Sequence, residues 1–348
     1  MSATATLPTT VTFIDQAAEG TRLSSEPMAP AQPHEMRLKT SCSLISVGTE
    51  LAYRVGGKNL RPHRGRSGYS LVARVAEPAQ TPRHPVPAGA GAGERPFQPG
   101  DRVFCDAGHA SQLLWDTARP CYRIPDAVTD RQATFGALGQ IGMHMIERAQ
   151  LSVGRTVVVI GQGTVGQLVN QLARLAGAGR VIGVDLSAPA RELALQLGAD
   201  AAIPPDAAAL RAELAKQLPG SVAPVFIEVT ASVQALAWTL AQAPRHARVV
   251  VTGTYGEDLT LNPFDTWIER ELDIVGAHQP KCPDTPQVYT PYNKGNNLLQ
   301  VYAWIAAGRL RVDPLIDVEL SPAQAVEFFN AAAEGRRAYR QPLVNWAV

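Results

Sequence analysis

The sequence predicts an α/β protein in which a doubly wound parallel sheet is combined with a smaller, mostly β domain. From about Gln132 to His278, short β-branched apolar runs alternate with helix-like windows, which is typical of parallel strands covered on both faces. Before residue 130, short β-type runs are separated by proline and glycine, which is typical of antiparallel strands. The length of 348 residues corresponds to about two domains.

The first region contains four strand candidates, namely Met36–Ile45, Tyr69–Val75, Asp101–Phe104 and Leu113–Asp116. Each is a short run of strand-forming residues near turn residues, so we expect a compact antiparallel domain. The stretch Glu77–Gly100 is rich in proline, alanine and glycine and offers few side chains that can pack. We therefore expect it to form an exposed insertion.

The second region contains strand candidates without clear polar alternation, as expected for buried parallel strands: Thr156–Ile160, Arg180–Asp185, Val225–Val229, Arg248–Gly253 and Asp273–Ala277. Helix-like windows follow the first three of them, at Val165–Ala176, Pro189–Leu197 and Ser232–Ala243. A further helix is expected near Asn297–Ala307. The tail Val312–Val348 has a strand–helix–strand pattern, and we expect it to return to the first domain.

Composition and charge exclude several classes of protein. Lys plus Arg number 32 and Asp plus Glu number 31, so the net charge of +1 provides no field that attracts nucleic acid or an anionic membrane. A hydrophobic content of 45% excludes intrinsic disorder. No apolar run reaches the ~18 residues that span a bilayer, and the N-terminus lacks a signal-peptide pattern. The four cysteines include no C-x-x-C pair, so we expect a reduced, cytoplasmic protein without a disulfide scaffold.

The strongest chemical signal is the segment 157–166, which reads VVVIGQGTVG. It places G-x-G-x-x-G directly after an apolar strand and before an amphipathic helix, which is the fingerprint of a Rossmann dinucleotide site. Gly161 allows the tight turn, Gly163 lets the backbone approach a pyrophosphate, and Gly166 allows helix and strand to pack closely. The alternative is a glycine-rich turn in an unrelated α/β protein.

The helix after this loop begins at Thr164 and Val165, where free N–H groups and a positive dipole end suit phosphate groups. The second strand ends at Asp185, 19 residues beyond the last glycine of the motif. A carboxylate in that place accepts hydrogen bonds from an adenine-ribose diol and repels a 2′-phosphate. The expected cofactor is therefore NAD rather than NADP.

Ligands of doubly wound sheets bind at the carboxyl ends of the strands. Residues at the ends of the later strands are therefore further cofactor-binding candidates: Thr230, Thr252, Gly253, Ala277 and His278. A single histidine is more often a hydrogen-bonded structural residue, so His278 has that alternative role.

The sequence resembles the medium-chain dehydrogenase/reductase superfamily, the relatives of zinc alcohol dehydrogenase. The resemblance rests on the cofactor half from the glycine motif to LGAD at 197–200, on GDRV at 100–103 and on DPLI at 313–316. It implies a GroES-like catalytic domain, residues 1–139 plus 279–348, that is split by a Rossmann NAD-binding domain, residues 140–278. It also implies an active site in the cleft between the two domains and a homodimer or homotetramer.

The chain departs from zinc-binding members of this superfamily at each catalytic ligand position. Their cysteine is replaced by Ser46, their histidine is replaced by Tyr69, and the third region, GALGQ at 136–140, offers no Cys, Asp or Glu. Zinc requires thiolate, imidazole or carboxylate ligands, so no zinc is expected. The chain also lacks the cysteine cluster of the structural zinc lobe. The alternative is a site rebuilt from Cys42, Cys105 or His109.

The SxGTE and GYS motifs of this chain resemble a zinc-less branch that includes the bacteriochlorophyllide hydroxyethyl dehydrogenases. Without a metal, a side chain must handle the hydroxyl proton of an alcohol substrate. By motif position, Tyr69 is expected to act as the acid/base or carbonyl polariser, relayed through Thr49. Glu50 is expected to support the site beside Ser46. His109, in a loop that reads AGHAS, resembles a cleft-facing histidine of zinc-less members and is a further candidate.

Two of these assignments have structural alternatives, because Tyr69 can simply fill the vacant metal position and His109 can be a hydrogen-bonded core residue. Two further segments are substrate-contact candidates. The basic loop Lys58–Arg66 would meet an anionic substrate, and Gln279–Asn297, which contains Tyr289, would cover a polyol-like one. No nucleic-acid or membrane partner is expected.

Together, the motifs and the resemblance predict an NAD-dependent oxidoreductase, a dehydrogenase that transfers a hydride between nicotinamide and a secondary alcohol or ketone metabolite. One alternative is an NAD(P)H-dependent quinone or enone reductase. A second alternative is a redox-neutral enzyme with tightly bound NAD. A third is a noncatalytic nucleotide-binding protein on the same fold, because fold alone does not determine function.

Overall fold

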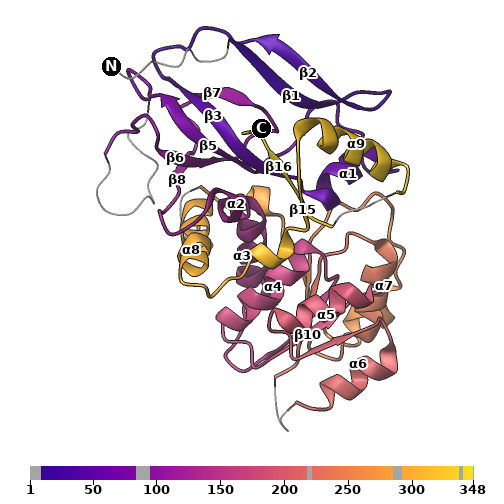
Figure 1. Cartoon of the computed structure of the whole chain (residues 1–348). Coiled ribbons are helices and arrows are strands. Elements are labelled where there is room, and N and C mark those ends of the chain that lie inside the picture. The colour runs from indigo at the N-terminus through magenta and orange to yellow at the C-terminus, as the bar shows by residue number, and fades with distance from the viewer. Residues whose placement is uncertain (1–8, 84–94, 218–221, 285–291, 337–339, 348) are drawn as a thin grey trace. The chain divides into compact units, whose positions relative to one another are not determined.

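The computed structural model describes residues 9–83, 95–217, 222–284, 292–336 and 340–347. The chain forms two compact units. Unit 1 comprises residues 1–54, 63–137 and 316–348, and unit 2 comprises residues 55–62 and 138–315. Figure 1 labels the α-helices and many of the strands. Within the described ranges, every helix is too short or too polar to span a membrane.

Unit 1 contains two β-sheets. The larger has seven strands in the order β15-β16-β3-β5-β6-β8, with β7 paired to β3 beside this path, and its pairs are antiparallel except β15–β16. The smaller has the order β2-β1-β4. The strands are β1 (Thr10–Gln16), β2 (Thr21–Pro27), β3 (Glu35–Leu44), β4 (Gly65–Arg66), β5 (Leu71–Glu77), β6 (Arg102–Cys105), β7 (Gln112–Asp116), β8 (Tyr122–Arg123), β15 (Val318–Leu320) and β16 (Pro342–Asn345). The helices are α1 (Val47–Val55), α2 (Asp130–Ala133) and α9 (Pro322–Ala333).

Buried apolar side chains form the core of unit 1. Leu38 of β3, Leu71 of β5 and Val103 of β6 belong to one cluster, because alternate residues of neighbouring strands face the same side of the sheet. In a second cluster, Phe329 of α9 packs with Val344 of β16. Each fully buried side chain of this size contributes about 1.5–3 kcal/mol relative to an exposed one.

Unit 2 is built on a six-stranded parallel sheet with the order β11-β10-β9-β12-β13-β14. The strands are β9 (Thr156–Ile160), β10 (Arg180–Val184), β11 (Ala201–Ile203), β12 (Val225–Glu228), β13 (Arg248–Val251) and β14 (Asp273–Gly276). The helices are α3 (Gly136–Ala149), α4 (Thr164–Leu175), α5 (Ala188–Gln196), α6 (Ala207–Leu214), α7 (Val233–Gln242) and α8 (Lys294–Ala306), with the short helices η1 (Phe264–Ile268), η2 (Gln279–Lys281) and η3 (Asp313–Leu315). Counted along the sheet, this is the 3-2-1-4-5-6 order of the doubly wound dinucleotide fold.

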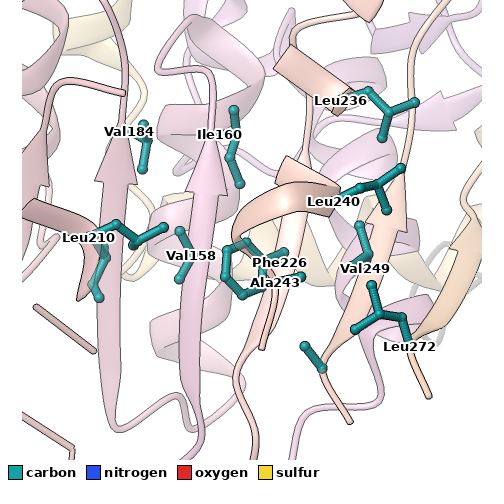
Figure 2. Packing of buried hydrophobic residues seen from close by; sticks show 12 residues of the cluster. Val158, Ile160, Val184, Leu210, Phe226, Leu236, Leu240, Ala243, Val249 and Leu272 are labelled. Carbon is teal, nitrogen blue, oxygen red and sulfur yellow. The ribbon is translucent and has the colours of Figure 1, made fainter. Parts of the chain in front are cut away.

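The strands β9, β10 and β12 of unit 2 are buried because helices cover them, whereas the edge strands β11 and β14 are partly exposed. Figure 2 shows Val158 of β9, Phe226 of β12 and Val249 of β13 in one cluster with Leu240 of α7. Alternating strands and helices bury the sheet on both faces, which explains why these strands lack a polar alternation in the sequence. The fold class expected from the sequence is thereby confirmed.

The nine strands and four helices expected by residue range are present, with ends that differ by a few residues, and the strand, helix and strand expected in the tail are β15, α9 and β16. Tyr69 lies in the loop before β5 rather than inside the strand. The hairpin β1–β2 and the pair β11 and α6 were not among the expected elements. The hairpin strand Thr21–Pro27 is mostly exposed and polar, and Ala201–Ile203 is only three residues long, so neither has a strong periodic signal.

Residues 279–315 group with unit 2, whereas the sequence analysis assigned them to the first domain. Helix α8 packs directly against α3: a Cβ placed on Gly139 would lie 2.7 Å from Val301 Cγ1. Gln140 Nε2 also donates a hydrogen bond to the carbonyl oxygen of Lys294 at 2.7 Å. The sequence analysis placed the domain boundary directly after the last parallel strand. The packing of α8 against α3 is a tertiary contact, which the sequence does not show.

Candidate functional site

The G-x-G-x-x-G loop joins β9 to α4 in unit 2. Gly161 has φ of +96°, which glycine adopts at least cost, and its N–H donates to the carbonyl oxygen of Val184 at 2.8 Å. A Cβ on Gly166 would lie 1.9 Å from the carbonyl oxygen of Gly161, so loop and helix touch backbone to backbone. A Cβ on Gly163 would have no heavy atom within 4 Å. Open space therefore borders the first turn of α4, whose N–H groups suit a phosphate.

Asp185 follows β10. Its Oδ2 accepts the N–H of Gln162 at 2.6 Å, and its Oδ1 accepts the N–H of Ser187 at 2.8 Å. Each carboxylate oxygen has a second lone pair, so the group can accept two further hydroxyl donors such as those of a ribose diol. Arg191 donates to the carbonyl oxygens of Asp185 and Leu186, both at 2.8 Å, which engages its Nη1 with the backbone.

A cavity of about 370 Å³ in unit 2 is lined by three predicted residues, Gly161, Asp185 and Thr230. Sequence reasoning missed the other lining residues, which are mostly apolar or small: Ile160, Val184, Leu186, Pro205, Ser232, Gln234, Ala235 and Trp238. Leu186 is 85% exposed, and a flat apolar ligand such as a nucleobase would cover it. Ile160 and Val184 are the last residues of parallel strands, and Leu186 and Pro205 lie two residues beyond strand ends, so position was the signal that could have identified these four. The other four belong to α7 or its N-cap and carry no such signal.

The remaining predicted cofactor residues also lie at strand or helix ends. They are Thr164 and Val165 in the first turn of α4, Thr252 and Gly253 after β13, and Ala277 and His278 after β14. The Thr252 hydroxyl donates to the carbonyl oxygen of Ala277 at 2.7 Å, which joins the ends of two adjacent strands. Ala277 is buried and His278 is exposed.

Glu228, at the end of β12, is a buried acid that the sequence analysis did not single out. Its Oε1 accepts the N–H of Thr230 at 2.7 Å and also the Thr230 hydroxyl, and its Oε2 accepts the Tyr255 hydroxyl. Burial raises the pKa of Glu228, while these hydrogen bonds oppose the increase. Burial and the charge of Glu228 together raise the pKa of Tyr255. Glu228 thus holds Thr230 in place beside the cavity.

Three hydroxyl groups meet in unit 1. Tyr69 donates a hydrogen bond to Ser46 Oγ, and Thr49, in the first turn of α1, also hydrogen-bonds to Tyr69. Burial raises the pKa of Tyr69 to about 12, against the lowering effect of these two hydrogen bonds. Tyr69 is therefore a neutral phenol at physiological pH, and it can donate a proton to an acceptor.

Glu50 and His109 form a buried network beside this hydroxyl cluster. His109 Nε2 lies 3.0 Å from Glu50 Oε2, and Glu50 Oε1 accepts the N–H of Ser46 at 2.7 Å. His109 Nδ1 lies 2.8 Å from Ser43 Oγ, which accepts the indole N–H of Trp346 at 2.9 Å. Since the indole can only donate, the Ser43 proton is available to His109 Nδ1, and His109 Nε2–H donates to Glu50. The His109 ring is fully buried, and both of its nitrogens form hydrogen bonds within the protein. His109 therefore supports the position of its neighbours.

The structure brings the five predicted catalytic residues together within unit 1, but they do not fit a catalytic zinc. Hydroxyl groups of Ser46 and Tyr69 occupy the motif positions of two ligands, and zinc prefers thiolate, imidazole or carboxylate donors. In the part of the chain that the structure describes, one group of three such donors converges closely enough to hold a metal ion. It lies in unit 2 and consists of His144, Glu147 and Cys282.

The two predicted substrate-contact segments receive little support from these contacts. In the basic loop, Lys58 pairs with Asp258, and Arg66 pairs with Glu26 at 2.6 Å. Both cations thus have acidic partners within the protein. Of the predicted cover residues, Tyr289 lies outside the described residues.

Comparison with known proteins agrees with this fold. Residues 164–291 match the protein-family model described as "Zinc-binding dehydrogenase". The chain is 27% identical to sorbitol dehydrogenase of Gallus gallus over 241 residues, which cover 67% of this chain but only 63% of that protein. It is 26% identical to sorbitol dehydrogenase of Ovis aries over 350 residues, which cover 90% of each protein.

A solved structure extends the comparison to nearly the whole chain. Galactitol-1-phosphate dehydrogenase from Escherichia coli superimposes with a TM-score of 0.76, covering 97% of this chain and 99% of that chain at 19% identity. The fold is that of the medium-chain alcohol dehydrogenases, as the motifs predicted. These matches support the predicted relation to zinc-binding dehydrogenases and do not single out the zinc-less branch.

Proposed function

We propose that this chain is an NAD-dependent oxidoreductase of the medium-chain class that interconverts a secondary alcohol and a ketone without catalytic zinc. The observation that carries the proposal is the cavity of unit 2, where Asp185 combines two backbone hydrogen bonds with free acceptor capacity. Relatives named sorbitol dehydrogenase and galactitol-1-phosphate dehydrogenase favour a polyol-like substrate.

The residues of unit 2 fit NAD. Bound NAD supplies the chemistry of hydride transfer at its nicotinamide ring. The open space at Gly163 and the first turn of α4 would hold the pyrophosphate, and Asp185 would accept hydrogen bonds from the ribose diol. A 2′-phosphate would meet the negative charge of Asp185, which favours NAD over NADP.

The hydroxyl cluster of unit 1 would manage the proton. In the direction of ketone reduction, the Tyr69 hydroxyl would donate its proton to the substrate oxygen as that oxygen gains negative charge. The hydroxyls of Ser46 and Thr49 would then donate to the phenolate and stabilise it until solvent returns a proton. Because the pKa of Tyr69 is raised to about 12, the neutral donor is the form present before the reaction.

The network of Glu50 would keep this cluster in position. Glu50 accepts the N–H of Ser46 and binds the His109 ring, so the loop that carries Ser46 has a fixed conformation. We assign Glu50 and His109 as positioning residues and Tyr69 as the catalytic acid. The SxGTE and GYS motifs, which resemble the zinc-less branch, contain Ser46, Glu50 and Tyr69 and agree with this assignment.

The test uses purified full-length protein, titration with NADH and NADPH by fluorescence, and a panel of polyols with their ketoses. We expect tighter binding of NADH and a Tyr69→Phe variant whose kcat falls about 10²- to 10⁴-fold, the usual contribution of general acid catalysis. Tyr53→Phe is the matched control, because Tyr53 lies on α1 with 38% exposure and outside the hydroxyl cluster. Its kcat is expected to stay unchanged.

Two results would contradict the proposal. If Tyr69→Phe retains full activity, Tyr69 only fills space and the proton donor lies elsewhere. If kcat falls in proportion to zinc removed by a chelator, while the melting temperature stays constant, the reaction depends on a metal and the hydroxyl mechanism is wrong.

A further inference from the structure

A group of metal-ligating side chains in unit 2 has no part in the proposed reaction. His144 and Glu147 are three residues apart on α3, which places them on the same face of the helix. Cys282 directly follows η2. Their ligand atoms, a histidine ring nitrogen, a carboxylate oxygen and the cysteine sulfur, all lie within 4.8 Å of one another.

This group is enclosed, and one of its polar atoms lacks a partner. His144 is 6% exposed and Cys282 is 2% exposed. Among the described residues, His144 Nδ1 has no hydrogen-bond partner, since the nearest Glu147 oxygen is 3.8 Å away. A buried nitrogen without a partner is unfavourable, and a cation between the three side chains would satisfy it.

Asn297 of α8 borders the same group. Its Nδ2 lies 3.2 Å from Glu147 Oε2 and 4.0 Å from Cys282 Sγ. Nitrogen and oxygen of a side-chain amide are assigned from their surroundings, and a half-turn about χ2 exchanges them. With a cation present, Asn297 Oδ1 would replace Nδ2 in this position and provide the fourth donor, an oxygen.

We propose that His144, Glu147 and Cys282 bind one Zn²⁺ ion in a structural site made entirely by unit 2. Imidazole, carboxylate and thiolate are donors that zinc prefers, whereas Mg²⁺ and Ca²⁺ prefer oxygen alone. The thiolate and the carboxylate carry two negative charges, which balance those of Zn²⁺ and leave the buried site neutral. The thiol proton of Cys282 is released to solvent on binding.

The observed distances leave little rearrangement for binding. Zinc–ligand distances of about 2.0–2.3 Å in a tetrahedral site place the ligand atoms about 3.3–3.8 Å apart. The separation of 3.8 Å between His144 Nδ1 and Glu147 Oε2 lies at the upper end of this range, and all the ligand atoms lie within 4.8 Å of one another, so binding would bring them about 1 Å closer at most. Bound zinc would fasten helix α3 to the segment after β14, and it would stabilise unit 2 because it binds the folded state.

The test begins with elemental analysis of the purified protein, followed by removal of metal and reconstitution with Zn²⁺ or Co²⁺. We expect about one zinc per chain, and with Co²⁺ a thiolate-to-cobalt charge-transfer band. Cys282→Ser should abolish the band and lower zinc content at least tenfold. The control is Cys42→Ser, which alters a buried cysteine of β3 outside the group and should retain both signals.

X-ray absorption of the wild-type zinc protein covers the case in which Cys282→Ser fails to fold. We expect one sulfur ligand at about 2.3 Å and nitrogen or oxygen ligands at about 2.0–2.2 Å. A wild-type protein that binds neither ion, a zinc shell without sulfur, or zinc that persists in Cys282→Ser would each overturn the proposal. Tyr69→Phe should keep its zinc, so this site and the proposed reaction are tested separately.

Discussion

Replacing Gly166 with alanine places a Cβ 1.9 Å from the carbonyl oxygen of Gly161, whereas real Cβ atoms essentially never approach closer than 3.0 Å. The difference is 1.1 Å, and the obstructing atom belongs to the backbone, so α4 or the loop must move. Such overpacking typically costs about 1–3 kcal/mol, and we expect about 3 kcal/mol here because no side chain can rotate away. For a unit of roughly 150–250 residues, this corresponds to a decrease in Tm of roughly 6–12 °C.

Gly163→Val is the matched comparison, because a Cβ at this position meets no heavy atom within 4 Å and the φ of −70° suits valine. We expect an unchanged Tm. The valine would occupy the space through which a pyrophosphate approaches the helix. Loss of two charge-assisted hydrogen bonds at about 1.5–3 kcal/mol each would weaken NADH binding by about 10²- to 10⁴-fold.

Thermal melting followed by circular dichroism and fluorescence titration with NADH measure the two effects on the same samples. An unchanged Tm for Gly166→Ala would refute the backbone contact as a constraint on folding. Full NADH affinity in a folded Gly163→Val variant would refute the assignment of the glycine loop to the pyrophosphate.

The other predictions concern single polar groups. Asp185→Asn should raise the Kd of NADH about tenfold or more, because a charge-assisted hydrogen bond contributes about 1.5–3 kcal/mol, and should raise the Kd of NADPH less. Fluorescence titrations measure both Kd values, and an equal rise for NADH and NADPH would contradict the role of Asp185 in ribose binding. Glu50→Ala leaves the Ser46 N–H and His109 Nε2 without their acceptor, so urea denaturation should show a loss of about 2–6 kcal/mol at about 1–3 kcal/mol per unpaired group. Wild-type stability in that variant would show that water replaces the carboxylate. Tyr69 ionises near pH 10 when unfolded and near pH 12 when folded, so the unfolded state loses its proton first. The free energy of unfolding should therefore fall by about 2–3 kcal/mol between these pH values, and Tyr69→Phe should reduce that fall in denaturant titrations.

The elements that could be predicted from sequence depend on residues close together in the chain. The loop from Gly161 to Gly166 is an example, since each glycine meets a backbone requirement within a few residues. The buried strand Thr156–Ile160 is another, because its uninterrupted apolar run indicates that both faces of the sheet are covered at this strand. Asp185 could be found because a strand end is a fixed place in the doubly wound fold.

The candidate catalytic residues could be named from motif positions, but their arrangement could not. His109 and Glu50 are 59 positions apart, and their hydrogen bond depends on how the loops of unit 1 pack. The raised pKa of Tyr69 depends on burial by many side chains. These are properties of the assembled core rather than of any one segment.

The sequence by itself determined the fold class, the nucleotide loop and the absence of zinc donors at three motif positions, because these features follow from local periodicity and residue chemistry. Tertiary structure alone decided that α8 belongs with α3 and that Cys282 lies beside His144, 138 positions earlier in the chain. The physical reason is that strand pairing and helix packing determine which distant side chains meet. A sequence pattern records only which side chains are available.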